Sequence, residues 1–192
     1  MIKQIRNFLL KLKQSGLSKM EPQMIYSYKH CGRIIKDTRV SSSTVINSKE
    51  NLELAENVFI GHYNFIESSN GISLGEGVQV TNYISILTHS SHISVRLYGR
   101  EYRNAKDPIG YKKGKVTIGA YSFIGPHSTI LPNTSIGKGC LVSAYSMLKG
   151  DYPDFSIISG NPAVVIGDTR SIDEDYLEQN QILKVYYDQW AK

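Results

Sequence analysis

An aliphatic residue recurs at every sixth position over a long stretch of this chain. The clearest series is Ile118, Ile124, Ile130, Ile136, Val142 and Leu148, and glycine directly follows three of these six residues. An amphipathic helix repeats near every 3.6 residues and a half-buried strand near every 2, so neither accounts for a period of six. The period indicates a parallel β-helix, in which each aliphatic side chain stacks on its equivalent one coil away.

An upstream series follows the same rule with one irregularity. Its blocks begin at Leu54, Ile60 and Ile66 and then, after a slip of two residues, at Leu74, Val80 and Ile86. A fainter series begins at Val40 and Ile46. If three hexapeptides close one triangular coil, the blocks predict about four coils, with a fifth, irregular one at the start. We therefore expect an all-β domain, a parallel β-helix, over residues 40–170.

Composition limits the classes of protein to consider. With 192 residues, 41% of them hydrophobic and 20% charged, the chain is expected to be one globular domain. No apolar run approaches the ~20 residues that span a bilayer. Cys31 and Cys140 fit neither a zinc motif nor a disulfide framework, which favours a reducing, cytoplasmic setting. The net charge of +5 suits anionic ligands, but no aromatic-basic motif accompanies it, so nucleic acid is not an expected partner.

Both ends of the chain leave the repeat. Within residues 1–39, apolar side chains at helical spacing predict a basic amphipathic helix. This helix would pack on its own protein or on a neighbouring subunit, or make a weak contact with an anionic membrane surface. Residues 171–192 are expected to form a C-terminal helix that packs back on the domain.

The repeat also stops between residues 89 and 115. This predicted loop insertion begins with "THSSH" and is rich in Arg, Lys and Tyr, a composition that suits anionic or sugar partners. A solenoid insertion maps to one face, often the binding face, and long loops of this kind are usually functional. The interruption therefore marks where we expect the acceptor to bind.

The residues described above carry a family resemblance. The [LIV]-G-x-x-x-x series and the ending "SIISGNPAVVIGDTR", residues 156–170, resemble the hexapeptide-repeat acyltransferases. "THSSH" and "VSAYSM" are similar to segments of the sugar O-acetyltransferases of capsule and lipopolysaccharide synthesis. The resemblance implies a left-handed parallel β-helix, a homotrimer with active sites between subunits, and acetyl transfer from acetyl-CoA to a sugar hydroxyl in surface polysaccharide biosynthesis.

Two histidines at the start of the insertion are the candidate catalytic residues. A sugar hydroxyl needs a base near neutral pH to attack a thioester, and histidine has a suitable pKa. In the resembled family the base stands where a coil ends. Counting from Leu74 places that position nearest His92 when one residue is inserted, so His92 is preferred and His89 is the alternative. The second histidine would then line the pocket, or both would only cap the turn.

The resemblance also implies where acetyl-CoA lies. Its pantetheine arm would run along small residues of the coils, and its nucleotide would lie near the "GNPA" segment, with two cations as phosphate partners. The residues implied are Ser122, Gly125, Ser143, Ala144, Lys149, Gly160, Asn161, Pro162 and Arg170.

Three other functions fit parts of the same sequence. An N-acetyltransferase acting on an amino sugar would use the same fold and the same kind of base. A γ-type carbonic anhydrase would bind zinc through histidines such as His89, His92 and His127, but no second histidine lies close to His127, so no metal is expected. A non-catalytic solenoid would explain the repeats but not the histidine-bearing insertion.

Overall fold

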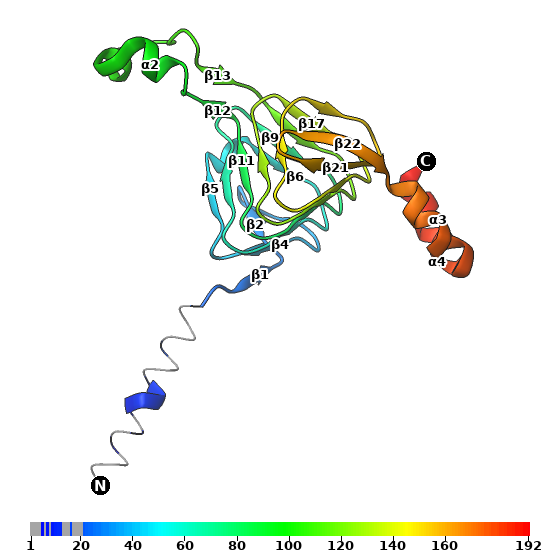
Figure 1. Ribbon diagram of the computed structural model, residues 1–192. Helices are drawn as coiled ribbons and strands as arrows, with labels where there is room; N and C mark the ends of the chain where they lie inside the picture. Colours follow the sequence, from blue (N-terminus) through cyan, green and yellow to red (C-terminus); the bar gives the residue numbers. More distant parts are fainter. Residues whose placement is uncertain (1–4, 6, 8, 13–15, 17–20) are drawn as a thin grey trace.

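The computed structural model describes residues 5, 7, 9–12, 16 and 21–192. The N-terminal amphipathic helix predicted within residues 1–39 lies largely outside the described residues; of its predicted apolar face, Ile5, Leu9 and Leu12 are described, and all three are exposed. From residue 21 onward the chain winds into stacked coils that form a triangular prism, with further segments projecting from it (Figure 1). The predicted parallel β-helix is confirmed.

The first face of the prism is an eight-stranded sheet. Its strands in spatial order are β1 (Met24–Tyr26), β4 (Arg39–Ser41), β7 (Phe59–Ile60), β10 (Gln79–Val80), β15 (Phe123–Ile124), β18 (Leu141–Val142), β21 (Ser156–Gly160) and β22 (Ala163–Asp168). The inner strands pair in parallel, whereas β1 and β22 pair antiparallel to their neighbours. The chain thus reverses direction at both ends of this face, and the "GNPA" segment is the turn that joins β21 to β22.

The other two faces are five-stranded parallel sheets. The second face contains β5 (Val45–Asn47), β8 (Phe65–Glu67), β11 (Ser85–Leu87), β16 (Thr129–Ile130) and β19 (Met147–Leu148). The third contains β6 (Leu52–Leu54), β9 (Ile72–Leu74), β14 (Val116–Ile118), β17 (Thr134–Ile136) and β20 (Asp151–Tyr152). Successive strands along the chain lie on successive faces, so the faces wrap one core.

The recurring aliphatic residues point inward and fill that core. In each sheet the residues of the period are direct partners in the ladder, for example Ile66, Ile86 and Ile130 on the second face. All six residues of the clearest series are buried, with at most 2% of their surface exposed. Burying aliphatic side chains in registered stacks excludes water along the whole axis and is the main stabilising contribution to such a fold.

The slip of two residues has a structural counterpart. Between the second and third faces the chain takes eight residues from Ile66 to Leu74, and also from Ile46 to Leu54, whereas the later coil from Ile130 to Ile136 takes six. One of these wide corners holds the 3₁₀ helix η1 (Lys49–Asn51). The other holds Ser68 to Gly71, beside the start of the predicted insertion.

Between β11 and β14 the chain leaves the coils. This segment contains β12 (His89–Ser90), α2 (Ser94–Tyr98), the 3₁₀ helix η2 (Gly99–Asn104) and β13 (Lys112–Lys113). Strands β12 and β13 pair antiparallel, and α2 projects away from the prism (Figure 1). We call residues 89–113 the arm.

Two helices follow the last strand of the first face. The helix predicted over residues 171–192 is present as α3 (Thr169–Gln179) and α4 (Gln181–Ala191), separated by Asn180, whose φ of −136° and ψ of 73° are not helical. The Asn180 carbonyl accepts a hydrogen bond from the Leu183 amide, and its side-chain amide donates to the Tyr176 carbonyl, local bonds that compete with a continuous helix.

The C-terminal helix pair is fastened to the prism by its last turn. Trp190 packs against Tyr121 and Phe155 at ring-centroid distances of 4.7 and 5.9 Å. The ammonium group of Lys138 donates to the carbonyl oxygens of the last three residues, at 2.8–3.1 Å, where a helix carries its partial negative charge.

The hairpin of β2 (Lys29–His30) and β3 (Arg33–Ile34) precedes the first complete coil. No helix within the described ranges has the length and apolar character to span a bilayer.

Candidate functional site

The arrangement with the clearest chemistry lies at the wide corner where the arm begins. Glu67 ends β8, and His89 begins the arm one coil above it; their side chains meet with 2.8 Å between Nδ1 of His89 and Oε2 of Glu67. The carboxylate is nearly buried, with 9% of its side chain exposed, whereas 35% of the imidazole is exposed. A buried carboxylate thus holds a solvent-accessible imidazole.

Hydrogen bonds fix the Glu67 carboxylate from three further sides. Oε2 accepts from the backbone amide and the hydroxyl of Thr88, at 3.2 and 2.7 Å, and Oε1 accepts from the Ser69 amide at 2.9 Å. Burial alone would raise the pKa of Glu67, but the hydrogen bonds from Ser69 and Thr88 outweigh it and lower the pKa to about 2. The group is therefore an anion at neutral pH.

This anion sets the tautomer of the imidazole. Because an ionised carboxylate only accepts hydrogen bonds, Nδ1 of His89 must carry the proton that lies toward Glu67. In the neutral ring Nε2 then has a free lone pair and can take a proton from another group. The Tyr111 ring, near the end of the arm, stacks on the imidazole with 5.6 Å between centroids and 16° between planes, which further limits how His89 can turn.

His92, the histidine preferred from the sequence, has different surroundings. It is exposed, and its Nδ1 lies 2.8 Å from the Ser90 hydroxyl. Its backbone carbonyl accepts a hydrogen bond from Arg96. A hydroxyl can serve as donor or acceptor, so it does not impose one tautomer as a carboxylate does. The geometry therefore favours His89 over His92 as a base.

The residues expected along the pantetheine chain of acetyl-CoA divide into two groups, those that pack the coils and those that reach the surface. Ser122 is fully buried, and its hydroxyl donates to the Gly137 carbonyl and accepts from the Cys140 amide, so it closes a corner of the core. A Cβ on Gly125 would lie 2.6 Å from the Ala144 amide nitrogen, so this glycine is needed for coil packing. Ser143 is half-buried, and its carbonyl accepts bonds inside the corner, while Ala144 is exposed.

The residues expected near the nucleotide lie on the surface. Lys149 is exposed, as are Gly160, Asn161 and Pro162 in the turn from β21 to β22. Arg170 is exposed too, but its guanidinium group is already paired with Asp168 at 2.5 Å and lies over the Phe155 ring at 4.9 Å. Lys149 and the turn thus remain open to a ligand, whereas Arg170 would have to exchange its present partner.

Sequence reasoning missed the carboxylate that holds the histidine. Glu67 and Ser69 belong to no motif in the sequence, and the "THSSH" segment gives no sign that Thr88 holds a carboxylate, because the pairing of Glu67 with His89 joins residues 22 apart and depends on the coil register. One signal could have found them: the slip of two residues falls at this corner, and an enlarged corner beside an interruption is an obvious position for a site.

The histidines considered for zinc do not come together. His127 is stacked between Tyr83 and Tyr145 at 4.9 and 4.8 Å, on the corner before the second face, whereas His89 stands at the corner after it. Within the part of the chain that the structure describes, no three His, Cys, Asp or Glu side chains form a cluster suited to a metal ion.

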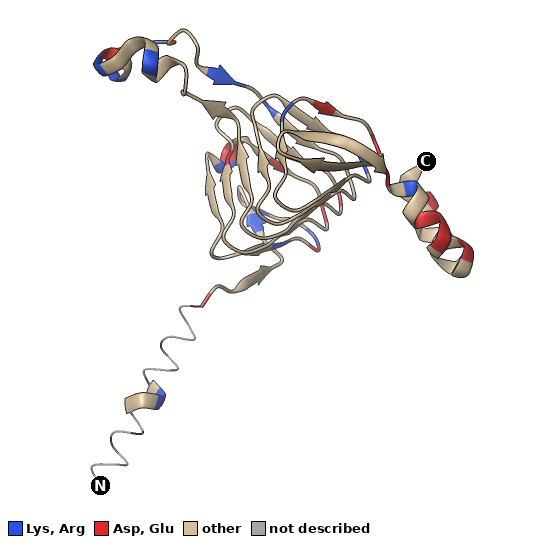
Figure 2. Ribbon diagram, viewed as in Figure 1, with Lys and Arg blue, Asp and Glu red and all other residues tan. Residues whose placement is uncertain are grey.

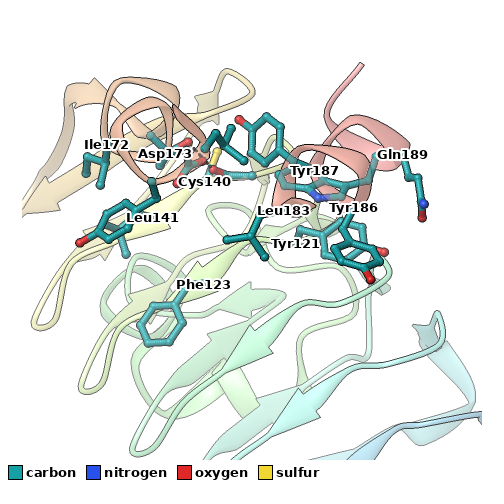
Figure 3. A pocket seen from close by; sticks show the side chains of 15 residues that line it. Tyr121, Phe123, Cys140, Leu141, Ile172, Asp173, Leu183, Tyr186, Tyr187 and Gln189 are labelled. Atoms are coloured by element: carbon teal, nitrogen blue, oxygen red, sulfur yellow. Dashed lines mark hydrogen bonds between the residues drawn. The ribbon is translucent and has the colours of Figure 1, made fainter. Parts of the chain in front are cut away.

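A cavity lies away from His89, between the C-terminal helices and the first face. It has a volume of about 620 Å³ and is lined mainly by aromatic and aliphatic side chains of β15, β18, α3 and α4 (Figure 3). Leu183 and Tyr186 of α4 reach down toward Phe123 and Tyr121 of the coils, and Asp173 of α3 supplies a carboxylate (Figure 3). We call this cavity the helix groove. No residue that the resemblance implies for catalysis lines it.

Comparisons with known proteins agree with the repeat. Residues 115–150 match the family described as bacterial transferase hexapeptide (six repeats). The chain is 41% identical over 64 residues to "Putative acetyltransferase YvoF" of Bacillus subtilis (strain 168), which covers 33% of this chain and 37% of that protein. The aligned segment thus spans little more than a third of this relative. The resemblance to hexapeptide-repeat transferases is confirmed.

Two solved structures share the fold. One is a single-residue mutant of AntD, an N-acyltransferase from Bacillus cereus, in complex with dTDP-4-amino-4,6-dideoxyglucose and coenzyme A; it superposes with a TM-score of 0.60 at 21% identity, over 75% of this chain and 89% of that one. The other is a maltose O-acetyltransferase from Clostridium difficile 630, with a TM-score of 0.56 at 24% identity, over 66% and 64%. At these identities the likeness concerns the fold.

Proposed function

We propose that this hexapeptide-repeat protein transfers an acetyl group from acetyl-CoA to a hydroxyl of a sugar, with His89 as general base. The observation that carries the proposal is the hydrogen bond between Nδ1 of His89 and the buried anion of Glu67. The similarity to the protein named "Putative acetyltransferase YvoF" supports the reaction class, and the two solved structures of the same fold, an N-acyltransferase bound to an amino-sugar nucleotide and a maltose O-acetyltransferase, support a sugar as acceptor.

The proposed reaction needs one base and no covalent enzyme intermediate. Nε2 of His89 accepts the proton of the acceptor hydroxyl while the oxygen attacks the thioester carbonyl. Glu67 stabilises the imidazolium ion that forms and keeps Nδ1 protonated throughout. The new C–O bond replaces the C–S bond, and His89 returns the proton to the departing thiolate. Protons and bonds therefore balance without a further reactant.

The surroundings of His89 suit a sugar acceptor. Tyr111 presents an aromatic ring beside the base, and the arm supplies six cations against two carboxylates, which suits an acceptor with phosphate groups. We place the acetyl donor along the coils at Ala144 and Lys149, with its nucleotide near the turn at Gly160–Pro162. In keeping with the resemblance, we further propose a left-handed coil, a homotrimer and a cytoplasmic role in surface polysaccharide biosynthesis.

The test is thiol release from acetyl-CoA with a panel of free, nucleotide-linked and amino sugars. His89→Ala is expected to lower the turnover number at least ~10²-fold, and His92→Ala, the matched variant in the same arm, to change it only a few-fold. Turnover that depends on His92 instead would restore the preference drawn from the sequence. A requirement for an amino sugar would indicate N-acetylation. Absence of both turnover and acetyl-CoA binding by calorimetry would exclude an acyltransferase and leave the non-catalytic solenoid.

A further inference from the structure

Positive charge is concentrated near the start of the chain. Residues 1–49 contain ten Lys and Arg against two acidic residues, a net charge of +8, whereas residues 50–192 contain twelve against fifteen, a net charge of −3. The first coil of the prism begins at β4, within the basic part, and α3 and α4, after the last coil, carry more acidic than basic residues (Figure 2). The two ends of the prism therefore differ in charge, and the N-terminal end is the positive one.

The hairpin of β2 and β3 holds part of this charge in a fixed place. His30, only 8% exposed, donates from Nε2 to the Leu52 carbonyl of the first coil at 2.7 Å, which fastens the hairpin to the end of the prism. Lys29 and Arg33 of the hairpin are exposed, and so is Lys49 of η1, beside the hairpin turn. Within the described residues none of these three cations forms an ion pair, so all three are open to an anionic partner.

Exposed apolar side chains accompany these cations. Ile34, the direct partner of Lys29 in the hairpin ladder, is 67% exposed, and Tyr26 of β1 is 69% exposed. Before β1, residues 5, 7, 9–12 and 16 are helical. The apolar side chains described there are about half exposed, namely Ile5, Leu9, Leu10 and Leu12. A surface of mixed positive and apolar character is thus left uncovered at this end, and such surfaces usually bind a partner.

A surface of this kind matches the boundary of an anionic lipid bilayer. Ammonium and guanidinium groups are attracted to the lipid phosphates, aliphatic side chains enter the edge of the acyl region, and tyrosine suits the level of the headgroups. A nucleic acid or a soluble phosphate compound would pair with the cations but would leave the exposed aliphatic side chains in water. The combination of charge and apolar surface therefore favours a membrane.

We propose that the N-terminal end of the prism, the hairpin of β2 and β3 together with the segment before it, binds to the surface of an anionic phospholipid bilayer. The hairpin supplies a fixed basic patch, and the preceding segment supplies exposed aliphatic side chains. His89 follows β11, in the third coil from this end, so it lies two strand spacings, about 10 Å, from the first coil and stays accessible. The inference goes beyond the proposed acetyl transfer and does not depend on it.

The experiment is binding of the full chain to lipid vesicles, read by flotation. One set of vesicles contains equal parts of phosphatidylcholine and phosphatidylglycerol, and the other contains phosphatidylcholine alone. The charge variant is Lys29→Glu with Arg33→Glu. Its matched control is Arg100→Glu with Arg103→Glu, an equal change of charge at exposed positions of the arm, the other basic segment.

A second pair of variants tests the apolar side chains. The apolar variant is Leu9→Ser with Leu12→Ser, and its matched control is Val95→Ser with Leu97→Ser, at exposed positions of the arm. Circular dichroism and thermal melting verify that each variant is folded.

We expect the wild type to float with the anionic vesicles, less so at raised salt, and its partition coefficient to be at least ~10-fold lower with phosphatidylcholine alone. Each N-terminal variant should lower the partition coefficient at least ~10-fold, and the arm controls should bind as the wild type does. No binding to the anionic vesicles would overturn the proposal, and so would equal binding to both lipid compositions. Wild-type binding by either N-terminal variant, or loss of binding in an arm control, would show that the lipid contact lies elsewhere.

Discussion

Glu67 shows how one buried carboxylate can couple function to stability. Its pKa in the folded protein is about 2 because hydrogen bonds from Ser69 and Thr88 favour the anion. For a carboxyl group with a lowered pKa, the stabilisation is present above the unfolded pKa, near 4.5, and is lost as the pH falls toward the folded value. The relevant window is therefore about pH 5 to 2.

We expect the free energy of unfolding of the wild type to fall by about 3 kcal/mol more than that of Glu67→Gln between pH 5 and pH 2. The variant is less stable at pH 7 but has no carboxyl to protonate. Urea titrations at several pH values measure the difference, with Glu50→Gln, at an exposed position, as the control. Parallel pH profiles of wild type and Glu67→Gln would show that the Glu67 carboxylate does not contribute to stability.

Gly125 illustrates what a sequence can and cannot reveal about a single residue. The resemblance implied that Gly125 lies beside the pantetheine chain of acetyl-CoA. In the structure this glycine has a packing role, because an added Cβ would meet the backbone of the next coil at Ala144 and Val142. The [LIV]-G pattern thus predicts the corner correctly. The pattern does not distinguish a glycine needed for coil packing from a neighbouring residue that would bind acetyl-CoA, because both lie at the same corner.

Gly125→Ala is expected to lower the free energy of unfolding by ~1–3 kcal/mol, because backbone atoms cannot move aside without shifting a coil. Gly167→Ala is the matched control: its added methyl group would meet only the flexible side chain of Ile157, at 3.2 Å or more. Urea denaturation of both variants compares them directly. Equal stabilities would mean that the coils can separate at this corner at little cost.

At the scale of the element, one corner of the prism has aromatic residues where the backbone favours glycine or asparagine. Tyr63, Tyr83, His127 and Tyr145 have φ angles of 58–60°, and their rings stack at 4.8–5.2 Å over successive coils. This conformation costs a residue other than glycine roughly 1–2 kcal/mol. Stacking contributes about 0.5–1.5 kcal/mol per pair and offsets that cost.

This balance predicts an unusual order of stabilities at Tyr83. Tyr83→Ala loses two stacked neighbours and keeps the strained φ, so its free energy of unfolding should fall by ~1–3 kcal/mol. Tyr83→Gly loses the same contacts but relieves the strain, so it should be the more stable of the two. The control is the same pair of changes at Ser135, in strand β17, where glycine should be the less stable. Chemical denaturation decides the order, and a less stable Tyr83→Gly would contradict the balance.

The elements themselves were the most predictable part. Each recurring aliphatic residue marks one strand of the core, so the repeat alone gives the strands, their parallel pairing and their register. The pairing of His89 with Glu67 was not predictable in this way, because it depends on the two extra residues of a wide corner and on which side chains meet across it. The six-residue period of aliphatic residues locates the coils, but it does not predict which side chains meet where the chain leaves them.

At the scale of the whole molecule, the arm and the coils are separable in principle. The arm starts and ends in the short ladder of β12 and β13, where Ser90 is the direct partner of Lys112. The next strand, β14, pairs with β9 and β17 inside the prism, so the coils above and below the arm contact each other without it. The core should therefore fold whether or not the arm is present.

Replacing residues 91–111 by Asn-Gly tests this directly, because a two-residue turn of this type joins directly paired antiparallel strands. We expect one cooperative thermal transition within a few degrees of the wild type, since the buried aliphatic stacks are unchanged. Loss of the cooperative transition would make the arm part of the folding core.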